Sequence, residues 1–376
     1  MYTMDKILIV KIGAIGDVVM SLAMLHDLRH RYPFAHITWV SGKTSSALVQ
    51  STKLVDQLIE IDEAQLFGKS LWRRMGALAK IWRTLSGRFF NLILTAHSDP
   101  RYRWISLFCR CTEHQYYKRR TQRPIPLPGR YHLHEYVRLS RDTEVPFAVS
   151  LPTLHIPSSS LRDAAIKALP KKQNVILCPG GAKNPLADDT LRRWPIHHYA
   201  KLMELLSHYP LNLIVTGAES DRWVEPHFAH LQYINWIGQW QLLDLIALFQ
   251  HANLIITHDS GPLHLAKFAS CPKLALFGPT NPFEKVGASE NIHVLWAGGK
   301  MACCPCYDGK KYAKCLRNDC LESISPEEVK AQALALLHKP ALDPLPVLEC
   351  TPSSYIPVFE NRARTPLAAS PLDNME

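Results

Sequence analysis

Three short turns in this sequence combine glycines with charged or hydroxyl side chains. They span residues 11–17, 179–183 and 258–264, and each follows an apolar run and precedes a helical pattern. Glycine lets the backbone approach a ligand closely, and the start of a helix offers backbone N–H groups without partners. Several such turns at one edge of a sheet suit a nucleotide diphosphate better than any single turn does.

Asp17 is the carboxylate of the first turn, and two interpretations are open for it. It can stabilise the N-terminus of the following helix as a cap or a first-turn residue. It also lies just beyond the carboxyl end of the first apolar run, where open α/β sheets bind their ligands. The second interpretation makes Asp17 a residue of the functional site.

The other two turns contain candidates for binding phosphate. Backbone N–H groups of Ser260, Gly261 and Leu263 can converge on an anion, although Asp259 and Ser260 could equally cap a helix. The glycine turn at residues 179–183 and the arginines that follow it at 192–193 add further groups that could bind phosphate. The candidate diphosphate-binding residues are Gly181, Lys183, Arg192, Asp259, Ser260 and Gly261.

A nicotinamide dinucleotide site is disfavoured. Its fingerprint needs three glycines as G-x-G-x-x-G and an acidic residue at the end of the second strand. The first turn has two glycines, and the second apolar run ends at Ser41-Gly42-Lys43.

Apolar runs of strand length alternate with helical patterns in both halves of the chain, which predicts βαβ units around parallel sheets. Strands are expected at 6–12, 36–41, 56–61 and 91–96, and again at 174–179, 211–217, 252–258 and 273–278. Helices are expected at 17–31, 195–208, 240–250 and 326–338. The predicted fold class is therefore α/β, with two Rossmann-like domains whose parallel sheets face a central cleft.

Prolines indicate where these domains begin and end. Pro146, Pro152 and Pro157 are followed by three serines, a composition typical of an extended linker. We predict an N-terminal domain at 1–157 and a C-terminal domain at 158–338. Residues 339–376 contain seven prolines and little periodicity, so we expect a largely disordered tail.

The composition describes a globular protein, because 47% of the 376 residues are hydrophobic and only 20% are charged. Charged residues interrupt the most apolar windows, which argues against a membrane span. The N-terminus reads directly into a strand without the pattern of a signal peptide, so we expect a cytoplasmic protein.

A basic run accounts for most of the formal net charge of +10. Between Arg101 and Arg141 ten Lys and Arg residues face two Glu residues, with tyrosines interspersed. A solvated surface is the ordinary explanation for such a run, and binding to nucleic acid is a second one.

Five of the ten cysteines lie between residues 303 and 320. Cys303, Cys306, Cys315 and Cys320 could hold a structural zinc, although their intervals are shorter than those of the usual paired knuckles. Free thiols and disulfides remain open alternatives.

The sequence resembles glycosyltransferase family nine, the ADP-heptose heptosyltransferases of lipopolysaccharide synthesis. The resemblance rests on KIGAIGDVV, PGGAKN followed by RRWP, TGAESD, THDSGPLHLAKF and LFGPTNP, in the family's order and spacing, and it runs from about residue 6 to 330. It implies a GT-B fold, with the acceptor on the N-terminal domain and the sugar nucleotide on the C-terminal one.

The resemblance also implies roles for individual residues. Asp17 matches the proposed catalytic base, and residues 259–261 match the diphosphate-binding loop. Asp221 matches the acidic position associated with the donor ribose and base, and Arg192 a phosphate-binding position that is usually Lys. In this family the basic run suits an anionic, lipid-linked glycan acceptor at a membrane surface. The acceptor candidates are Lys118, Arg119, Arg120, Arg123 and His132.

These expectations combine into one leading function, an inverting transferase that moves a heptose-like sugar from an ADP-heptose-class donor to a lipopolysaccharide core or related glycan. No D-x-D motif occurs in the sequence, so we expect a reaction that needs no metal and no cofactor, with Arg192 and Lys183 in place of a cation. We expect peripheral contact with the cytoplasmic face of the inner membrane, and no nucleic acid partner. The alternatives are a basic nucleic-acid-binding protein with a Cys-rich metal knuckle, and another Rossmann enzyme that binds a sugar nucleotide.

Overall fold

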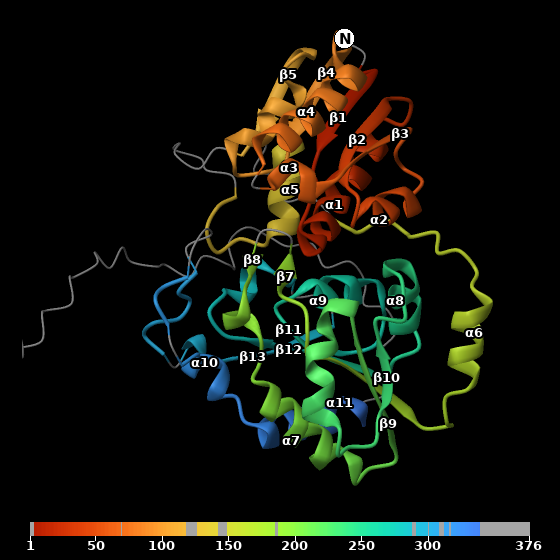
Figure 1. The fold of residues 1–376 in the computed structure, drawn as a ribbon, viewed down its shortest axis with the longest axis vertical. Helices are drawn as coiled ribbons and strands as arrows, with labels where there is room; N and C mark the ends of the chain where they lie inside the picture. The colour runs from red at the N-terminus through yellow and green to blue at the C-terminus, as the bar shows by residue number, and fades with distance from the viewer. Residues whose placement is uncertain are drawn as a thin grey trace, which may run out of the picture.

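Two parallel β-sheets, one above the other, organise the chain (Figure 1). This computed structural model describes residues 4–68, 70–117, 126–141, 149–184, 187–287, 291–299, 301–307, 312–315 and 317–338. No helix within these ranges is long and apolar enough to cross a membrane.

The first sheet has the strand order β3-β2-β1-β4-β5, with every pair parallel. Its strands are β1 (Lys6–Val10), β2 (His36–Gly42), β3 (Gln57–Ile61), β4 (Phe89–Thr95) and β5 (Arg110–Tyr116). The chain proceeds from β1 to one side of the sheet and later returns to its other side at β4. Ligands of open α/β sheets bind at such a switch point, and the turn that holds Asp17 follows β1 there.

Helices cover both faces of this sheet. They are α1 (Ile15–Arg31), α2 (Ser46–Ser51), α3 (Glu63–Phe67), α4 (Leu71–Leu85), the 3-10 helix η1 (Pro100–Ser106) and α5 (His132–Arg141). Helix α1 buries Val18, Leu22 and Leu25 against the sheet and packs along α5. This burial anchors the start of α1, and with it Asp17, at the carboxyl edge of the strands.

The second sheet has the order β10-β9-β6-β11-β12-β13 and is also parallel. Its strands are β6 (Gln173–Cys178), β9 (Leu211–Gly217), β10 (Ile234–Ile237), β11 (Leu254–His258), β12 (Lys273–Phe277) and β13 (Ile292–Trp296). The switch point lies between β6 and β11. Those two strands lead into the other two glycine turns, so each predicted turn lies at a switch point.

The surrounding elements of the second sheet are mostly short. They are α6 (Ser160–Lys167), a hairpin of β7 (Lys183–Asn184) and β8 (Ala187–Asp188), η2 (Thr190–Arg192), α7 (Ile196–Ser207), η3 (Glu219–Phe228), α8 (Leu242–Phe249), α9 (Gly261–Leu265), η4 (Ala266–Phe268), η5 (Pro282–Glu284), η6 (Ala297–Gly299), α10 (Asp319–Glu322) and α11 (Pro326–Leu337). The two sheets meet through their helices, because α1 contacts α9 and α2 contacts α8.

All eight predicted strands and all four predicted helices are present, with ends shifted by at most three residues. The sequence interpretation missed three strands of the two large sheets, β5, β10 and β13, and the two-residue strands β7 and β8. Strand β5 has the sequence RCTEHQY and lies at a sheet edge, so it lacks the apolar run by which the others are recognised. Sheet membership changes between Tyr116 and Gln173, and the domain boundary proposed at 157/158 stays a prediction.

Candidate active site

Asp17 lies in the first turn of α1 and forms an ion pair with a buried lysine. Lys11 Nζ is 3.5 Å from Asp17 Oδ2, and the two side chains are 3% and 40% exposed. The N-cap position of α1 belongs to Ala14, not to Asp17. Asp17 therefore presents a partly exposed carboxylate at the switch point while Lys11 holds it from beneath.

Positive charges keep this carboxylate ionised. Burial alone would raise the pKa of Asp17, but the charges of Lys11 and Lys285 outweigh it and lower the pKa well below its ordinary value. The nearby Tyr136 has a pKa well above its ordinary value, because of burial and the charge of Asp17. At neutral pH this part of the site thus places the anionic Asp17, which can accept a proton, beside the protonated phenol of Tyr136.

The opposite wall of the site is built around Asp259, directly after β11. Its Oδ2 accepts a hydrogen bond from Thr280 Oγ1 at 2.7 Å and lies 3.5 Å from Arg192 Nη1. Arg192 also contacts Asp189 Oδ2 at 2.9 Å. Burial opposes ionisation of Asp259, but the charge of Arg192 lowers its pKa below the ordinary value. The structure thus brings together Arg192 and Asp259, which are far apart along the chain and which the sequence analysis assigned to one diphosphate site.

Several buried polar atoms of this wall lack a hydrogen-bond partner among the described residues. They are Arg192 Nε, His258 Nε2, Asp259 Oδ1 and His264 Nδ1. A buried polar group without a partner costs about 1–3 kcal/mol, so native structures keep few of them. Burial lowers the pKa of both His258 and His264 to about 3, which leaves these rings neutral. Such a concentration of unpaired groups is typical of a site that a polar ligand completes.

Asp221 links the second glycine turn to the end of β9. Its Oδ1 accepts a hydrogen bond from the Gly181 N–H at 2.9 Å, and its Oδ2 accepts one from the Ala218 N–H at 2.8 Å. Gly181 adopts a φ of +81°, which favours glycine. In the structure Asp221 therefore orients two loops, and its proposed contact with a ribose stays a prediction. Lys183 lies in β7 of the same region, and its side chain is outside the described part.

The two walls meet where α1 packs against α9. A Cβ atom at Gly16 would overlap with the imidazole ring of His264, so a glycine is needed for this approach. Further contacts join the two domains: His132 Nδ1 lies 3.3 Å from Lys285 Nζ, and the Gly129 N–H donates to Glu284 Oε1 at 2.8 Å. The structure thus brings Asp17 and the Asp259 wall to one interdomain site.

Sequence reasoning missed Lys285, whose charge acts on both Asp17 and Asp259. It follows the LFGPTNP motif, but no spacing rule marks it, because it reaches the site only when the domains meet. His132 is at this same contact, and burial together with Lys285 lowers its pKa to about 3. The other proposed acceptor residues lie outside the described residues: Lys118, Arg119, Arg120 and Arg123.

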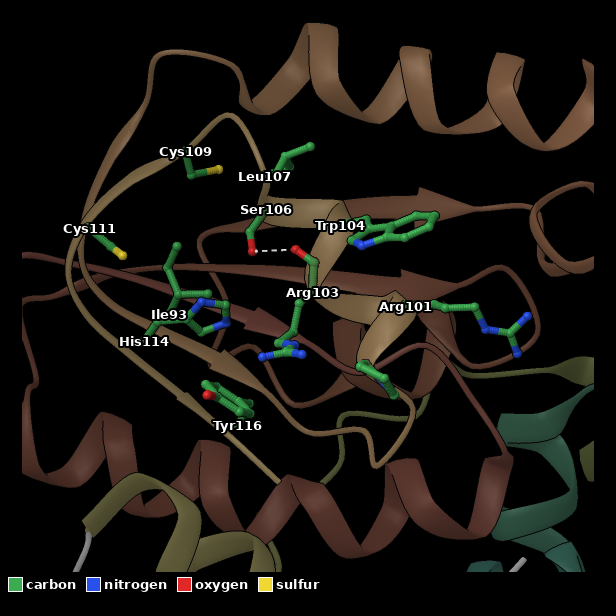
Figure 2. Close-up of a pocket in the computed structure, with 11 residues that line it drawn as sticks. Ile93, Arg101, Arg103, Trp104, Ser106, Leu107, Cys109, Cys111, His114 and Tyr116 are labelled. Carbon is green, nitrogen blue, oxygen red and sulfur yellow. Dashed lines mark hydrogen bonds between the residues drawn. The ribbon is translucent and has the colours of Figure 1, made fainter. Parts of the chain in front are cut away.

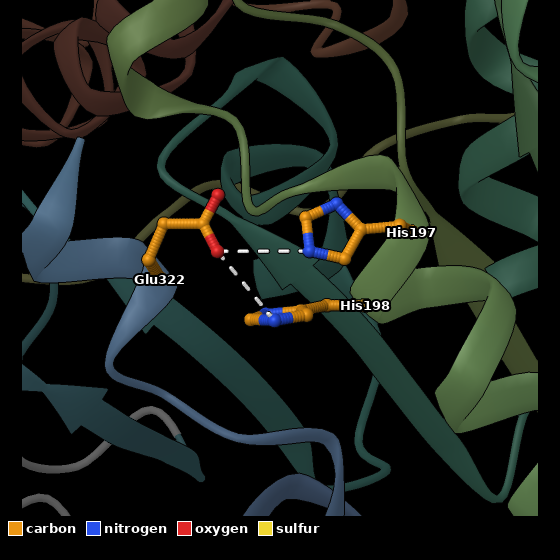
Figure 3. A group of neighbouring side chains, drawn as sticks. All are labelled: His197, His198 and Glu322. Atoms are coloured by element: carbon orange, nitrogen blue, oxygen red, sulfur yellow. Dashed lines mark ion pairs between the residues drawn. The ribbon is translucent and has the colours of Figure 1, made fainter. Parts of the chain in front are cut away.

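The Cys-rich segment does not assemble a four-sulfur site. Cys303, Cys306, Cys315 and Cys320 are free thiols, and among the described residues no three cysteine sulfurs lie within 4.8 Å of one another. These described thiols do not form a compact cluster of metal ligands, and the structural zinc proposed there stays a prediction. One group of possible metal ligands does occur, His197, His198 and Glu322, with Glu322 Oε2 3.6 Å from Nε2 of each histidine (Figure 3).

The same segment lies closer to the site than its place in the sequence suggests. The rings of Tyr307 and Tyr312 are tilted against each other with centroids 4.6 Å apart, and both tyrosines act electrostatically on Arg192. Cys306 donates its backbone N–H to Pro279 O at 2.9 Å, next to Thr280. The segment therefore packs beside the Arg192 and Asp259 wall.

Comparisons with known proteins agree on one family. The family model described as glycosyltransferase family 9 (heptosyltransferase) matches residues 107–316. The chain is 25% identical over 297 residues to the lipopolysaccharide core heptosyltransferase OpsX of Haemophilus influenzae, covering 73% of this chain and 80% of that one. It is 24% identical over 314 residues to lipopolysaccharide heptosyltransferase 2 of Salmonella typhimurium, covering 74% and 84%.

Solved structures share the fold at low sequence identity. A family 9 glycosyl transferase from Veillonella parvula has a TM-score of 0.69 and 21% identity, covering 90% of this chain and 98% of that one. The E. coli heptosyltransferase WaaC with ADP-2-deoxy-2-fluoro heptose has a TM-score of 0.62 and 16% identity, covering 88% and 99%. The two facing parallel-sheet domains are those of the GT-B fold.

Proposed function

The chain belongs to glycosyltransferase family 9, the heptosyltransferase family, and on that premise we propose which glycosyl transfer it performs. The donor is a nucleotide diphosphate sugar of the ADP-heptose class, and the acceptor is a lipopolysaccharide core or related glycan. The transfer inverts the anomeric carbon and needs no metal. One observation carries this proposal: an ionised Asp17 faces a wall of unpaired polar groups around Arg192 and Asp259.

Asp17 is the base of the proposed reaction. Its carboxylate accepts the proton of an acceptor hydroxyl while that oxygen forms a bond to the anomeric carbon. The bond between the anomeric carbon and the diphosphate oxygen breaks on the opposite face, and its electron pair leaves with the diphosphate. Attack opposite the leaving group inverts the configuration. A base on one domain and a leaving-group site on the other match this geometry.

The wall around Arg192 stabilises the leaving diphosphate. Arg192 carries a permanent charge, and its unpaired Nε can donate to a phosphate oxygen. Backbone N–H groups at Ser260 and Gly261, at the start of α9, add donors without charge. Gly181 and Lys183 lie on the neighbouring loop, where we propose that they complete the diphosphate site, with Asp221 on the donor ribose and base.

The electrostatics of the described site support a reaction without a divalent cation. A cation on a diphosphate is usually held by carboxylates without other partners, whereas Asp17 and Asp259 each lie beside a Lys or Arg. We propose that the charges of Arg192 and Lys285, which both act on Asp259, take the place of a metal at the leaving diphosphate. Arginine and lysine can supply that stabilisation themselves.

The acceptor is proposed to lie on the N-terminal domain, next to Asp17 and His132, with residues 118–123 contributing cations. An anionic glycan linked to lipid would bring the enzyme to the cytoplasmic face of the inner membrane as a peripheral protein. The nucleic-acid-binding and other Rossmann-enzyme interpretations give way to membership of a transferase family.

The proposal is tested by incubating the purified chain with ADP-heptose and a delipidated core acceptor in excess chelator. Product mass and the anomeric coupling in its NMR spectrum report transfer and stereochemistry. We expect one heptose to be added with inverted configuration and undiminished rate. A rate that disappears with chelator and returns with magnesium would contradict the metal-free mechanism, and transfer only from another sugar nucleotide would contradict the donor.

A further inference from the structure

The N-terminal domain carries a face where large hydrophobic side chains are exposed together. It is formed by α4, η1, the two residues that follow η1, and Phe89 at the start of β4, and we call it the α4–η1 face. Among the described residues, seven of the twelve large hydrophobic side chains that are exposed belong to it. They are Leu71, Trp72, Met75, Phe89, Trp104, Leu107 and Phe108. Exposed hydrophobic residues that occur singly are ordinary, but a cluster of this kind marks a binding surface.

Contacts between the two helices make this face continuous. Trp82 of α4 donates its indole N–H to Trp104 O at 2.7 Å, and its ring lies 5.0 Å from the ring of Phe108. Two depressions flank η1, and Arg101 and Trp104 line both of them. The larger, of about 430 Å³, is bordered by Trp104, Leu107 and Arg103 on one side and by strand β5 on the other (Figure 2).

The charge of this face has one sign. Residues 71–111 contain eight Lys and Arg residues and a single acid, Asp99. That acid is already paired with Arg101 at 2.6 Å. Helix α4 contains no acidic residue, and its most exposed large hydrophobic side chain is Trp72, which is 88% exposed. The face therefore combines an excess of positive charge with exposed aromatic rings.

We propose that the α4–η1 face docks onto an anionic phospholipid surface. Tryptophan and phenylalanine favour the level of the lipid headgroups, and a helix with lysines and arginines beside exposed tryptophan lies in that plane. Arginine and lysine keep their charged ends among the headgroups while their stems lie along apolar surface. A protein partner of this face would need acidic side chains as well as pockets for two tryptophans, whereas an anionic bilayer supplies both requirements at once.

The inner side of η1 connects this face to the catalytic turn. Tyr102 of η1 stacks on His97 with ring centroids 3.5 Å apart, and His97 Nε2 accepts a hydrogen bond from the Ile12 N–H at 3.0 Å. Ile12 belongs to the turn that leads to Asp17. A membrane beneath the α4–η1 face therefore lies against the acceptor domain. That consequence rests on the proposed function, in which the acceptor is linked to lipid.

Vesicle co-sedimentation of the full chain tests the proposal directly. Phosphatidylglycerol vesicles should bind the protein, pure phosphatidylcholine vesicles should bind it far less, and 0.5 M salt should weaken the binding. Replacing Arg73 and Arg74 by Gln should lower the vesicle partition coefficient roughly 30-fold, from the usual contribution of a cation near an anionic surface. Trp72→Ser combined with Trp104→Ser should lower it at least about tenfold.

Matched variants distinguish binding through the α4–η1 face from nonspecific adsorption to vesicles. Phe34→Ser with Leu161→Ser removes two side chains that are 99% and 78% exposed elsewhere, and Lys171→Gln with Lys172→Gln removes two exposed cations from the other domain. Both controls should bind vesicles like the wild type. Thermal unfolding of each variant checks that the fold is retained.

Three results would overturn the inference: no binding of the wild type to anionic vesicles, equal losses in the control variants, or dimerisation that depends on Trp72 and Trp104 without vesicle binding. Transfer to a delipidated acceptor should be the same in all variants. If vesicles bind but no heptose is transferred, the proposed function fails and the docking face stands. If heptose is transferred but vesicles do not bind, the docking face alone fails.

Discussion

Replacing Asp17 by Asn would remove the proposed base while keeping the shape of the side chain. We expect kcat to fall by about 10²–10⁴-fold, the usual contribution of a general base. ADP affinity should change little, because Asp17 belongs to the wall opposite Arg192 and Asp259.

The same substitution also affects stability, and its size follows from the ion pair. Breaking a fully buried pair costs about 3–5 kcal/mol. Lys11 is 3% exposed but Asp17 is 40% exposed, so water screens the pair and the cost is nearer to about 1–2 kcal/mol. A folded protein with a stability of about 5–15 kcal/mol survives this loss, with a Tm lowered by a few degrees. The expected loss of turnover therefore exceeds anything that unfolding explains at 25 °C.

Single-turnover transfer, ADP calorimetry and thermal melting should be measured on the same preparation. Asp27→Asn is the matched control, because Asp27 also lies on α1 and pairs with Arg31 and Arg141. It should lower Tm without affecting turnover. If the Asp17 variant keeps turnover within about fivefold of the wild type, or if the Asp27 variant loses as much, Asp17 is a structural residue and the mechanism is wrong.

The pH profile gives a second view of the same group. Asp17 acts in its ionised form, and its pKa lies well below the ordinary value of a carboxyl group. Base catalysis should therefore be undiminished down to about pH 5, and an acid limb should begin only below the ordinary carboxyl pKa of about 4. An acid limb near pH 6 that vanishes in the Asp17 variant would mean that the carboxyl is not held ionised by Lys11.

Three further predictions concern the opposite wall and the domain contact. Arg192→Ala should weaken ADP binding about 10- to 150-fold, the equivalent of about 1.5–3 kcal/mol, with little effect on acceptor affinity. Gly16→Ala should keep ADP binding but reduce transfer at least about tenfold, because the added methyl group meets the His264 ring and holds the domains apart. The free energy of unfolding should decrease as the pH is lowered from about 6.5 to about 3. The decrease should reach up to about 1.4 kcal/mol per pH unit for each of His258 and His264.

The sign of the pH effect follows from the two histidines. Their pKa values are about 3 in the folded protein and about 6.5 when unfolded, so the unfolded chain binds more protons in that interval. Urea titrations at pH 7 and pH 5 measure this difference, and equal stability at both pH values would contradict the buried neutral rings.

The control for the Arg192 variant is Lys201→Ala, on the exposed side of α7. If the Lys201 variant loses as much ADP affinity as the Arg192 variant, Arg192 has no specific role in binding ADP. Normal transfer by the Gly16 variant would show that this close approach is not needed.

The elements of the fold could be predicted because parallel strands are buried on both faces and read as apolar runs. The three glycine turns could be predicted for the same reason, since each begins where such a run ends. Edge strand β5 could not be predicted in this way, because most of its side chains are polar and exposed or only partly buried.

Features that depend on contacts between the two domains could not be predicted from the sequence. Lys285 lies 268 residues from Asp17, yet its charge helps to keep that carboxylate ionised. Asp221 was assigned to the donor from its motif, and only the structure reveals that both carboxylate oxygens accept backbone hydrogen bonds. A motif identifies a position, whereas its hydrogen bonds depend on loops brought together by the sheet.

The contact of Gly16 with His264 has a consequence for how such enzymes diversify. The residues proposed to bind the donor fall between 181 and 261, and the proposed base is residue 17, so recombination of two genes within the linker would join one acceptor half to a foreign donor half. In such a hybrid the two domains can approach as they do here only if a glycine stands at position 16 wherever the other domain carries a histidine at position 264. Gly16 and His264 thus restrict which N-terminal domains can pack against which C-terminal domains.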